Sequence, residues 1–241
     1  MLRGFVFICF LTCFSSYAET LKVAAIEWPP FSGKDLPKNG LSVAITMKAL
    51  ETAGYQVNFK FVPWERSLQG VEEGLYHVLP AVWINEERKE YMFFSKPYAA
   101  NELVVVSPAA KKLSFEGYDS LKGKNAGLVR GYSYPKALLD ADFIPKSYVG
   151  KVEQNLKKLA RGRVDFTIGD KIVLSYTAKK SLGSMAKNLH FDSTPIEKKD
   201  LFMTVSKRTP NAKTVIENIN KALEQLEASG ELDNLIKEFG I

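Results

Sequence analysis

Two residues of opposite charge, Arg88 and Asp170, stand at positions from which they can bind a small charged molecule. Arg88 follows an apolar run over 78–82 that predicts a buried strand, and Asp170 follows another over 164–168. Open α/β sheets bind their ligands at the carboxyl ends of strands. Arg can hold a carboxylate through two parallel hydrogen bonds, and Asp can accept hydrogen bonds from an ammonium group. Together they favour a zwitterionic ligand, although a strand-end Arg or Asp taken alone is more often part of a structural ion pair.

Two neighbouring segments can assist Arg88. Asn85 precedes it by three residues and is a preferred N-cap residue for the helix expected there. The segment 130–133 follows the strand predicted over 126–129, and it can offer backbone N–H groups and the Ser133 hydroxyl to an anion. We therefore expect Arg88 and Ser133 to bind the same carboxylate.

Catalytic chemistry finds no comparable support in the sequence. His77 and His190 are the only two imidazoles, and neither has metal-ligand spacing, so a surface or core position is favoured for both. The chain contains no G-x-S-x-G, P-loop or G-x-G-x-x-G motif. The adjacent carboxylates Glu86 and Glu87 are typical of a solvated or capping pair. We assign no catalytic residue, metal ion or cofactor, and we expect a protein that is not an enzyme.

The composition is that of a globular protein. The 241 residues are 46% hydrophobic, and 33 Lys+Arg against 27 Asp+Glu give a net charge of +6. The basic residues are scattered along the chain, which favours a solvated basic surface over nucleic-acid binding. No apolar stretch reaches the ~18 residues that a transmembrane helix needs.

Residues 1–18 are typical of a cleavable signal peptide. A basic start precedes an apolar run over 4–14, and small residues lead to Ala18, where we expect cleavage. The run is too short for a membrane anchor. Cys9 and Cys13 both lie in this segment, so the exported chain is expected to contain no disulfide.

The elements that position these residues alternate between strand and helix, which predicts an α/β fold with a mostly parallel sheet. Apolar residues recur at helical spacing after Thr209-Pro210, which we interpret as an N-cap followed by Pro in the first turn. The predicted strands cover 21–26, 55–61, 78–82, 103–106, 126–129 and 164–168, and the predicted helices cover 41–53, 63–74, 152–161 and two segments after 209. Two such strand–helix sets suggest two lobes.

A series of short segments occurs in a characteristic order along the chain: WPPF at 28–31, PWER at 63–66, ER at 87–88 with FSKPY at 94–98, GKNAG at 123–127, RGYS at 130–133, GRVD at 162–165 before Asp170, and ASGEL at 228–232. With these segments the sequence resembles the periplasmic solute-binding proteins of polar amino-acid ABC transporters, the family-3 extracellular binding proteins. No single motif is specific, but their order and spacing are.

The resemblance implies a two-lobed α/β fold, the type II periplasmic binding protein fold, with two crossing strands as the hinge of a Venus flytrap. It implies a first lobe over 19–98 and 199–241, and a second lobe over 99–198. It also implies a periplasmic monomer that captures a small zwitterionic solute, such as a polar amino acid, and delivers it to an ABC transporter permease.

The resemblance assigns roles to individual residues. It places Arg88 and Ser133 on the α-carboxylate of the ligand and Asp170 on the α-ammonium group. The other positions it implies around the ligand are Trp64 against the ligand side chain, Glu27, Trp28 and Phe31 in the first loop, the carbonyl of Ala81, and Trp83 and Tyr132 beside the ligand.

Several positions depart from the family pattern. Trp83 stands where a small residue is common, Tyr132 replaces a Thr or Ser beside the anion site, and Asn85 replaces a Thr. The three tryptophans are also compatible with core positions. The sequence therefore leaves the identity of the ligand open. It also leaves open two alternatives, a ligand-sensing module of a receptor and a dehydratase-like enzyme on the same fold.

Overall fold

The first lobe is built on a parallel sheet around strand β1. The computed structural model describes residues 19–240. The elements of this part are β1 (Thr20–Ala25), η1 (Pro37–Asn39), α1 (Leu41–Thr52), β2 (Gln56–Phe61), α2 (Trp64–Glu72), β3 (Val78–Val82), α3 (Glu86–Tyr91) and β4 (Met92–Phe94). Strand β1 pairs in parallel with β2 and β3. Parallel neighbours need crossover connections, and α1 and α2 supply them.

The second lobe repeats this arrangement around β6 and β8. Its elements are β5 (Ala99–Pro108), η2 (Tyr118–Leu121), β6 (Ala126–Val129), α4 (Lys136–Asp140), β7 (Lys146–Val149), α5 (Val152–Ala160), β8 (Phe166–Asp170), α6 (Lys171–Leu182), η3 (Gly183–Asn188) and β9 (Leu189–Phe191). Strand β6 pairs in parallel with β7 and β8. Helices α5 and α6 bury their apolar residues against β5, β6 and β8.

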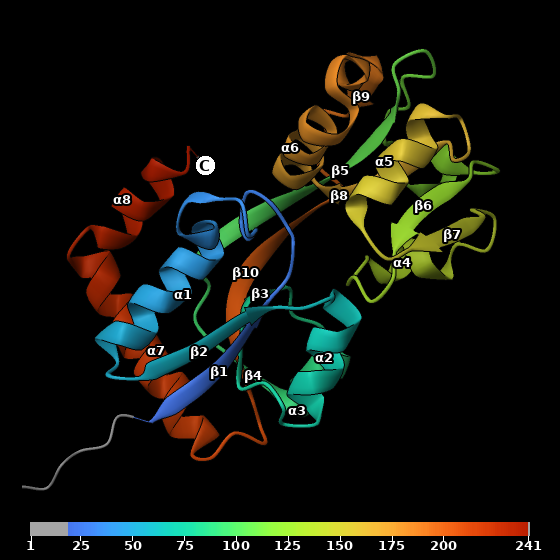
Figure 1. Cartoon of the computed structure of the whole chain (residues 1–241). Coiled ribbons are helices and arrows are strands. Elements are labelled where there is room, and N and C mark those ends of the chain that lie inside the picture. The colour runs from blue at the N-terminus through green and yellow to red at the C-terminus, as the bar shows by residue number, and fades with distance from the viewer. Residues whose placement is uncertain (1–18, 241) are drawn as a thin grey trace, which may run out of the picture.

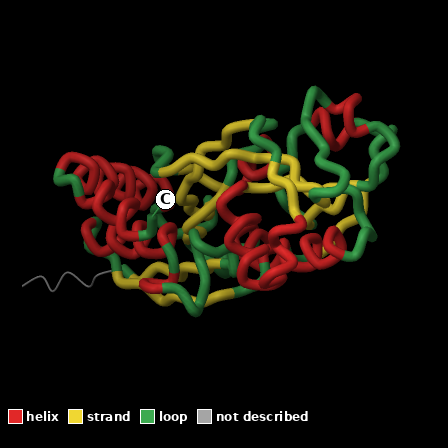
Figure 2. Tube along the Cα trace, turned by 90° about the horizontal axis from the view of Figure 1, so that it is seen from above, coloured by secondary structure: helices red, strands yellow, loops and turns green. Residues whose placement is uncertain are grey.

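Two long strands join the lobes. Strand β10 (Glu197–Ser206) pairs antiparallel with β5, and each continues into a different lobe. Strand β5 goes on to pair with β8, whereas β10 pairs with β3 and β4. The resulting order is β2-β1-β3-β10-β5-β8-β6-β7. Figure 1 shows β5 and β10 crossing between the lobes, and Figure 2 shows strands extending from the helices at one end to those at the other.

The chain returns to the first lobe through two final helices, α7 (Ala212–Ala228) and α8 (Glu231–Glu238). They lie with α1 on one side of the first lobe, and α2 and α3 lie on the other (Figure 1). The apolar face predicted for α7 is confirmed, since Val215, Ile219, Ala222 and Leu226 are all buried.

The start predicted for α7 is wrong. The helix begins at Ala212, and its N-cap is Asn211 in a left-handed conformation with φ of 51°. Thr209 instead belongs to the preceding turn, where its N–H donates to the Ser206 carbonyl. Asn adopts this conformation more readily than most residues, which lets the turn end directly in the helix.

The segment expected to be a signal peptide lies outside the described residues. Within residues 19–240, no helix is both long enough and apolar enough to span a membrane.

Candidate ligand-binding cleft

Arg88 is held in place by the start of α3. The Asn85 Oδ1 atom accepts a hydrogen bond from the Arg88 N–H at 2.8 Å, which confirms the predicted cap. The Arg88 side chain is only 3% exposed. Its Nη1 donates to the Trp83 carbonyl at 2.5 Å, and its Nη2 donates to the Gly131 carbonyl at 2.7 Å. The guanidinium carbon lies 5.0 Å from the ring centroid of Trp64, a cation–π distance.

The charge of Arg88 has no protein counter-ion among residues 19–240. None of the carboxylates in the described part of the chain lies within ion-pair distance of it. Burial lowers the pKa of Arg88, but a guanidinium stays protonated in proteins. A buried cation is costly unless it is paired, so this site is built to receive an anion.

Removal of the cap provides a test of this local structure. Asn85→Ala is expected to lower the free energy of unfolding by about 1 kcal/mol, because one helix N–H loses its acceptor. Asn85→Ser keeps an oxygen that can accept this hydrogen bond and should stay close to the wild type. Urea unfolding of the two variants measures the difference, and equal stability would contradict the capping role.

Asp170 occupies the matching position in the second lobe. It ends β8 and caps α6, since its Oδ1 accepts a hydrogen bond from the Val173 N–H at 2.7 Å. The residue is 2% exposed, and its Oδ2 has no hydrogen-bond partner among the described residues. Burial raises the pKa of Asp170 to about 6, and the hydrogen bond from Val173 only partly offsets this. An open carboxylate oxygen in such surroundings is suited to an ammonium group.

Asn101 is a site residue that the sequence reasoning missed. It lies on the hinge strand β5 and is 1% exposed. Its Oδ1 accepts a hydrogen bond from the Trp83 indole N–H at 2.8 Å, while its Nδ2 has no partner within the described chain. Its side chain lies close enough to Asp170 to oppose the rise in the pKa of that carboxyl, although the geometry is outside that of a hydrogen bond. The sequence feature that could have indicated Asn101 is its position, as a polar residue two positions before the buried apolar run that starts at Leu103.

Aromatic rings from both lobes form the walls of the cleft. Trp28 packs edge-on against Trp83, with ring centroids 5.5 Å apart. Tyr132, from the second lobe, packs edge-on against Trp64 and Trp83 of the first. These rings enclose a cavity of about 290 Å³, open solvent included. Its lining residues are Ile26, Trp28, Trp64, Ala81, Trp83, Arg88, Tyr132, Ser133 and Leu201.

Seven of the ten predicted site residues therefore line one cavity, and the other three lie elsewhere. Glu27 lines a neighbouring cavity of about 680 Å³, together with Lys34 and Lys151. Asp170 lines a third, of about 250 Å³. Phe31 is fully buried behind Trp28, with ring centroids 4.9 Å apart, and lines none of these three cavities.

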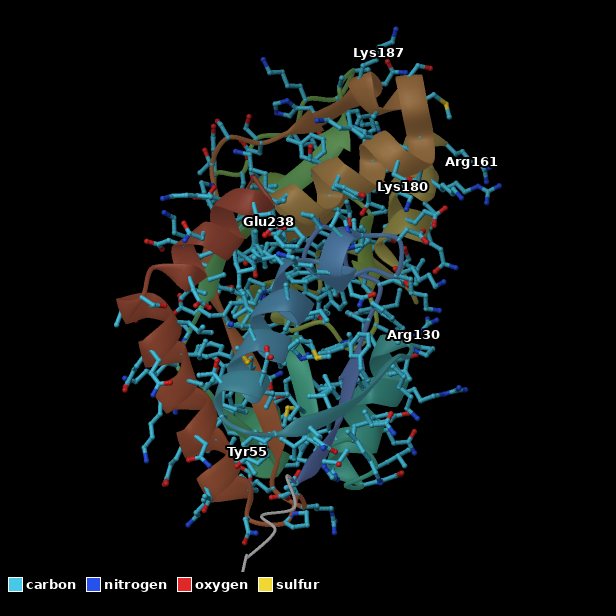
Figure 3. All side chains as sticks on the ribbon, turned by 60° about the vertical axis from the view of Figure 1, so that its left-hand side comes forward. Tyr55, Arg130, Arg161, Lys180, Lys187 and Glu238 are labelled. Carbon is cyan, nitrogen blue, oxygen red and sulfur yellow. The ribbon has the colours of Figure 1, made fainter. Side chains whose placement is uncertain are left out.

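The lobes touch each other across the cleft. The Trp64 indole N–H donates to the Gly131 carbonyl at 2.9 Å. At the rim, Glu65 lies 3.6 Å from the Arg130 Nε, and Figure 3 shows Arg130 beside α2. These exposed charges contribute little free energy, so the closed arrangement depends on the buried contacts.

Among residues 19–240, no group of three or more His, Cys, Asp or Glu side chains is placed to hold a metal ion. The cleft combines one buried cation, one buried carboxylate and aromatic walls, a set suited to binding a small zwitterion.

The chain is similar to known binding proteins over nearly its full length. It is 28% identical over 221 residues to a protein described as a probable histidine-binding protein of Neisseria gonorrhoeae, covering 88% of this chain and 80% of that one. Two solved structures share the fold. One is an amino acid ABC transporter substrate-binding protein of Streptococcus pneumoniae bound to L-arginine, with a TM-score of 0.77, 18% identity, and coverage of 91% and 94% of the two chains.

The second solved structure is a histidine kinase sensor domain described as similar to periplasmic binding proteins. Its TM-score is 0.82 at 17% identity, covering 92% of this chain and 96% of that one. The family model of the bacterial extracellular solute-binding proteins, family 3, matches residues 21–240. The match spans both lobes and the two hinge strands, and the chain belongs to this family.

Proposed function

We propose that this protein captures a small zwitterion of the amino-acid class between its lobes, in the periplasm, and delivers it to an ABC transporter permease. One observation carries the proposal. Within the described part of the chain, Arg88 in the first lobe is a buried cation without a counter-ion, and Asp170 in the second is a buried carboxylate with an open oxygen. An α-amino acid offers the two complementary charges, a carboxylate for Arg88 and an ammonium group for Asp170.

The remaining sequence expectations form part of this proposal. The first lobe would comprise 19–98 and 199–241, and the second 99–198, because β5 and β10 cross between the lobes near these limits. Ser133 would assist Arg88 at the carboxylate, and the Ala81 carbonyl would assist Asp170. Glu27, Trp28, Trp64 and the aromatic pair Trp83 and Tyr132 would surround the ligand side chain, with Phe31 supporting Trp28.

Hinge closure explains how the two charges select a ligand. A ligand favours the closed state only through contacts that the open state lacks. Arg88 and Asp170 belong to different lobes, so one ligand can contact both only when the cleft is shut. Two similar proteins support an amino-acid ligand. One relative is described as a probable histidine-binding protein, and a structure of similar fold is that of an amino acid ABC transporter substrate-binding protein.

A sensing role is the second candidate. The sensor domain of a histidine kinase has the same fold, with a TM-score of 0.82. The same cleft would then report ligand occupancy to a receptor rather than to a permease. Purification of the protein with its membrane partner from the producing cell distinguishes the two roles. For an enzyme of the dehydratase type, the described residues that line the Arg88 cavity include no carboxylate or histidine that could serve as acid or base.

A thermal-shift screen of ligand-stripped protein tests the proposal. The panel holds the common L-amino acids, their D-forms, polyamines, organic acids without an amino group, and sugars. A ligand present at a hundred times its Kd stabilises the native state by about 2.7 kcal/mol, which moves the midpoint by several degrees. We expect shifts with one or a few amino acids. A shift only with acids that lack the ammonium group would contradict the role of Asp170.

A further inference from the structure

Tyr132 lies where the two lobes meet, inside the cleft. Its ring centroid is 6.4 Å from that of Trp64 and 6.0 Å from that of Trp83, edge-on in both cases. Of the residues that the structure describes, it is the one that lines the Arg88 cavity, the Asp170 cavity and the Glu27 cavity together. The Tyr132 side chain therefore divides the cleft into compartments and separates Arg88 from Asp170.

The backbone carbonyl of the residue before Tyr132 already accepts a hydrogen bond from the Arg88 guanidinium. The Gly131 carbonyl accepts hydrogen bonds from Arg88 Nη2 at 2.7 Å and from Trp64 Nε1 at 2.9 Å. This carbonyl oxygen takes the position in which a ligand carboxylate oxygen would meet the guanidinium. Gly131 has φ of 70°, and a Cβ there would lie 3.2 Å from Trp64 Nε1, so a glycine suits this close approach.

Both charges act on the Tyr132 phenol. Burial raises the pKa of Tyr132 above its ordinary value, Tyr134 and Asp170 raise it further, and Arg88 lowers it. The hydroxyl thus lies within electrostatic reach of both groups that would hold the zwitterion.

We infer that Tyr132 is the specificity-determining residue of the cleft, because its side chain fills the space between Arg88 and Asp170 and must be displaced by any ligand that reaches both. The inference rests on the proposed function. The neighbouring cavity, about 680 Å³ with open solvent included, is also lined by Tyr132 and would receive the displaced ring. That ring then takes space beside the ligand, so the wild-type protein selects amino acids with small side chains over bulky ones.

Calorimetric titration of three variants tests this inference. In Tyr132→Ala the ring no longer has to be displaced, so amino acids should bind more tightly, by about tenfold for bulky side chains and less for small ones. Tyr132→Phe keeps the ring and should resemble the wild type. Tyr148→Ala is the matched control, because Tyr148 is 44% exposed on β7 and lines none of the three cleft cavities.

The outcomes separate this inference from the proposed function. Weaker binding by Tyr132→Ala, or an unchanged preference between small and bulky ligands, would overturn the role of Tyr132 alone. Failure of the wild type and of every variant to bind any amino acid would overturn the proposed function and this inference with it. Thermal unfolding of the ligand-free variants shows that each is folded before titration.

Discussion

Arg88→Ala is expected to lower the affinity for amino-acid ligands on the order of a thousandfold. The side chain is 3% exposed and lacks a protein carboxylate among the described residues, so the ligand carboxylate would be its counter-ion. In the variant this carboxylate would enter the closed cleft without a cation. The two carbonyl groups that now accept from Arg88, on Trp83 and Gly131, would add further repulsion.

Two further variants make the Arg88 result specific. Arg88→Lys keeps the charge but cannot form two parallel hydrogen bonds, so its affinity should fall between those of the wild type and Arg88→Ala. Arg130→Ala removes a half-exposed cation at the rim of the same cleft, and its effect should stay within about threefold. Calorimetry at one pH and ionic strength compares all three. Near-wild-type affinity in Arg88→Ala would contradict the assigned role.

Asp170→Asn is expected to weaken amino-acid binding about a hundredfold at pH 8 and to remove its pH dependence. An ammonium group pairs with the ionised form of Asp170, whose pKa is about 6. Wild-type affinity should therefore fall about tenfold for each pH unit below 6, because the carboxyl must first lose its proton. Calorimetry in two buffers of different ionisation enthalpy detects the proton released on binding near pH 6.

The same pKa fixes the sign of the stability change in the ligand-free protein. The folded-state pKa of Asp170, about 6, lies above its ordinary value of 3.8, so the native state binds more protons between these values. The contribution of Asp170 protonation to the free energy of unfolding is about 3 kcal/mol. It is fully present below pH 4 and is lost as the pH rises through 6. Ligand-free Asp170→Asn should therefore be more stable than the wild type at pH 8 and similar to it near pH 4.

Asp165 provides the matched control for Asp170. It is a carboxylate of the same lobe, but hydrogen bonds from Lys111 and the Asn125 N–H lower its pKa. Asp165→Asn should therefore leave the pH dependence of ligand affinity between pH 5 and 8 unchanged. If this variant instead removes the dependence, the titrating group is not Asp170.

The parts of the site that depend on local structure were predictable from the sequence. Asn85 before Glu86 is a recognisable N-cap, and this cap places Arg88 one turn into α3 whatever the rest of the chain does. Asp170 ends a short apolar run, which placed it at a strand end. The apolar spacing of α7 likewise predicted its buried face, although not its first residue.

The parts that depend on contacts between the lobes were not predictable. The position of Tyr132 between Arg88 and Asp170 results from closure of the second lobe onto Trp64 and Trp83. Asn101 was missed because its burial arises from pairing of β5 with β10, a contact between residues about a hundred positions apart. The start of α7 was misplaced because a left-handed Asn211 leaves no periodic signal in the sequence.

The most direct test of the zwitterion site is a calorimetric comparison of one amino acid with two of its analogues. The amino acid is the one that gives the largest shift in the thermal screen, one analogue lacks its α-ammonium group, and the other lacks its α-carboxylate. Each analogue is expected to bind at least about a hundredfold more weakly, since each leaves Asp170 or Arg88 unpaired in the closed cleft. Equal affinity of either analogue would contradict the pairing of both groups with one ligand.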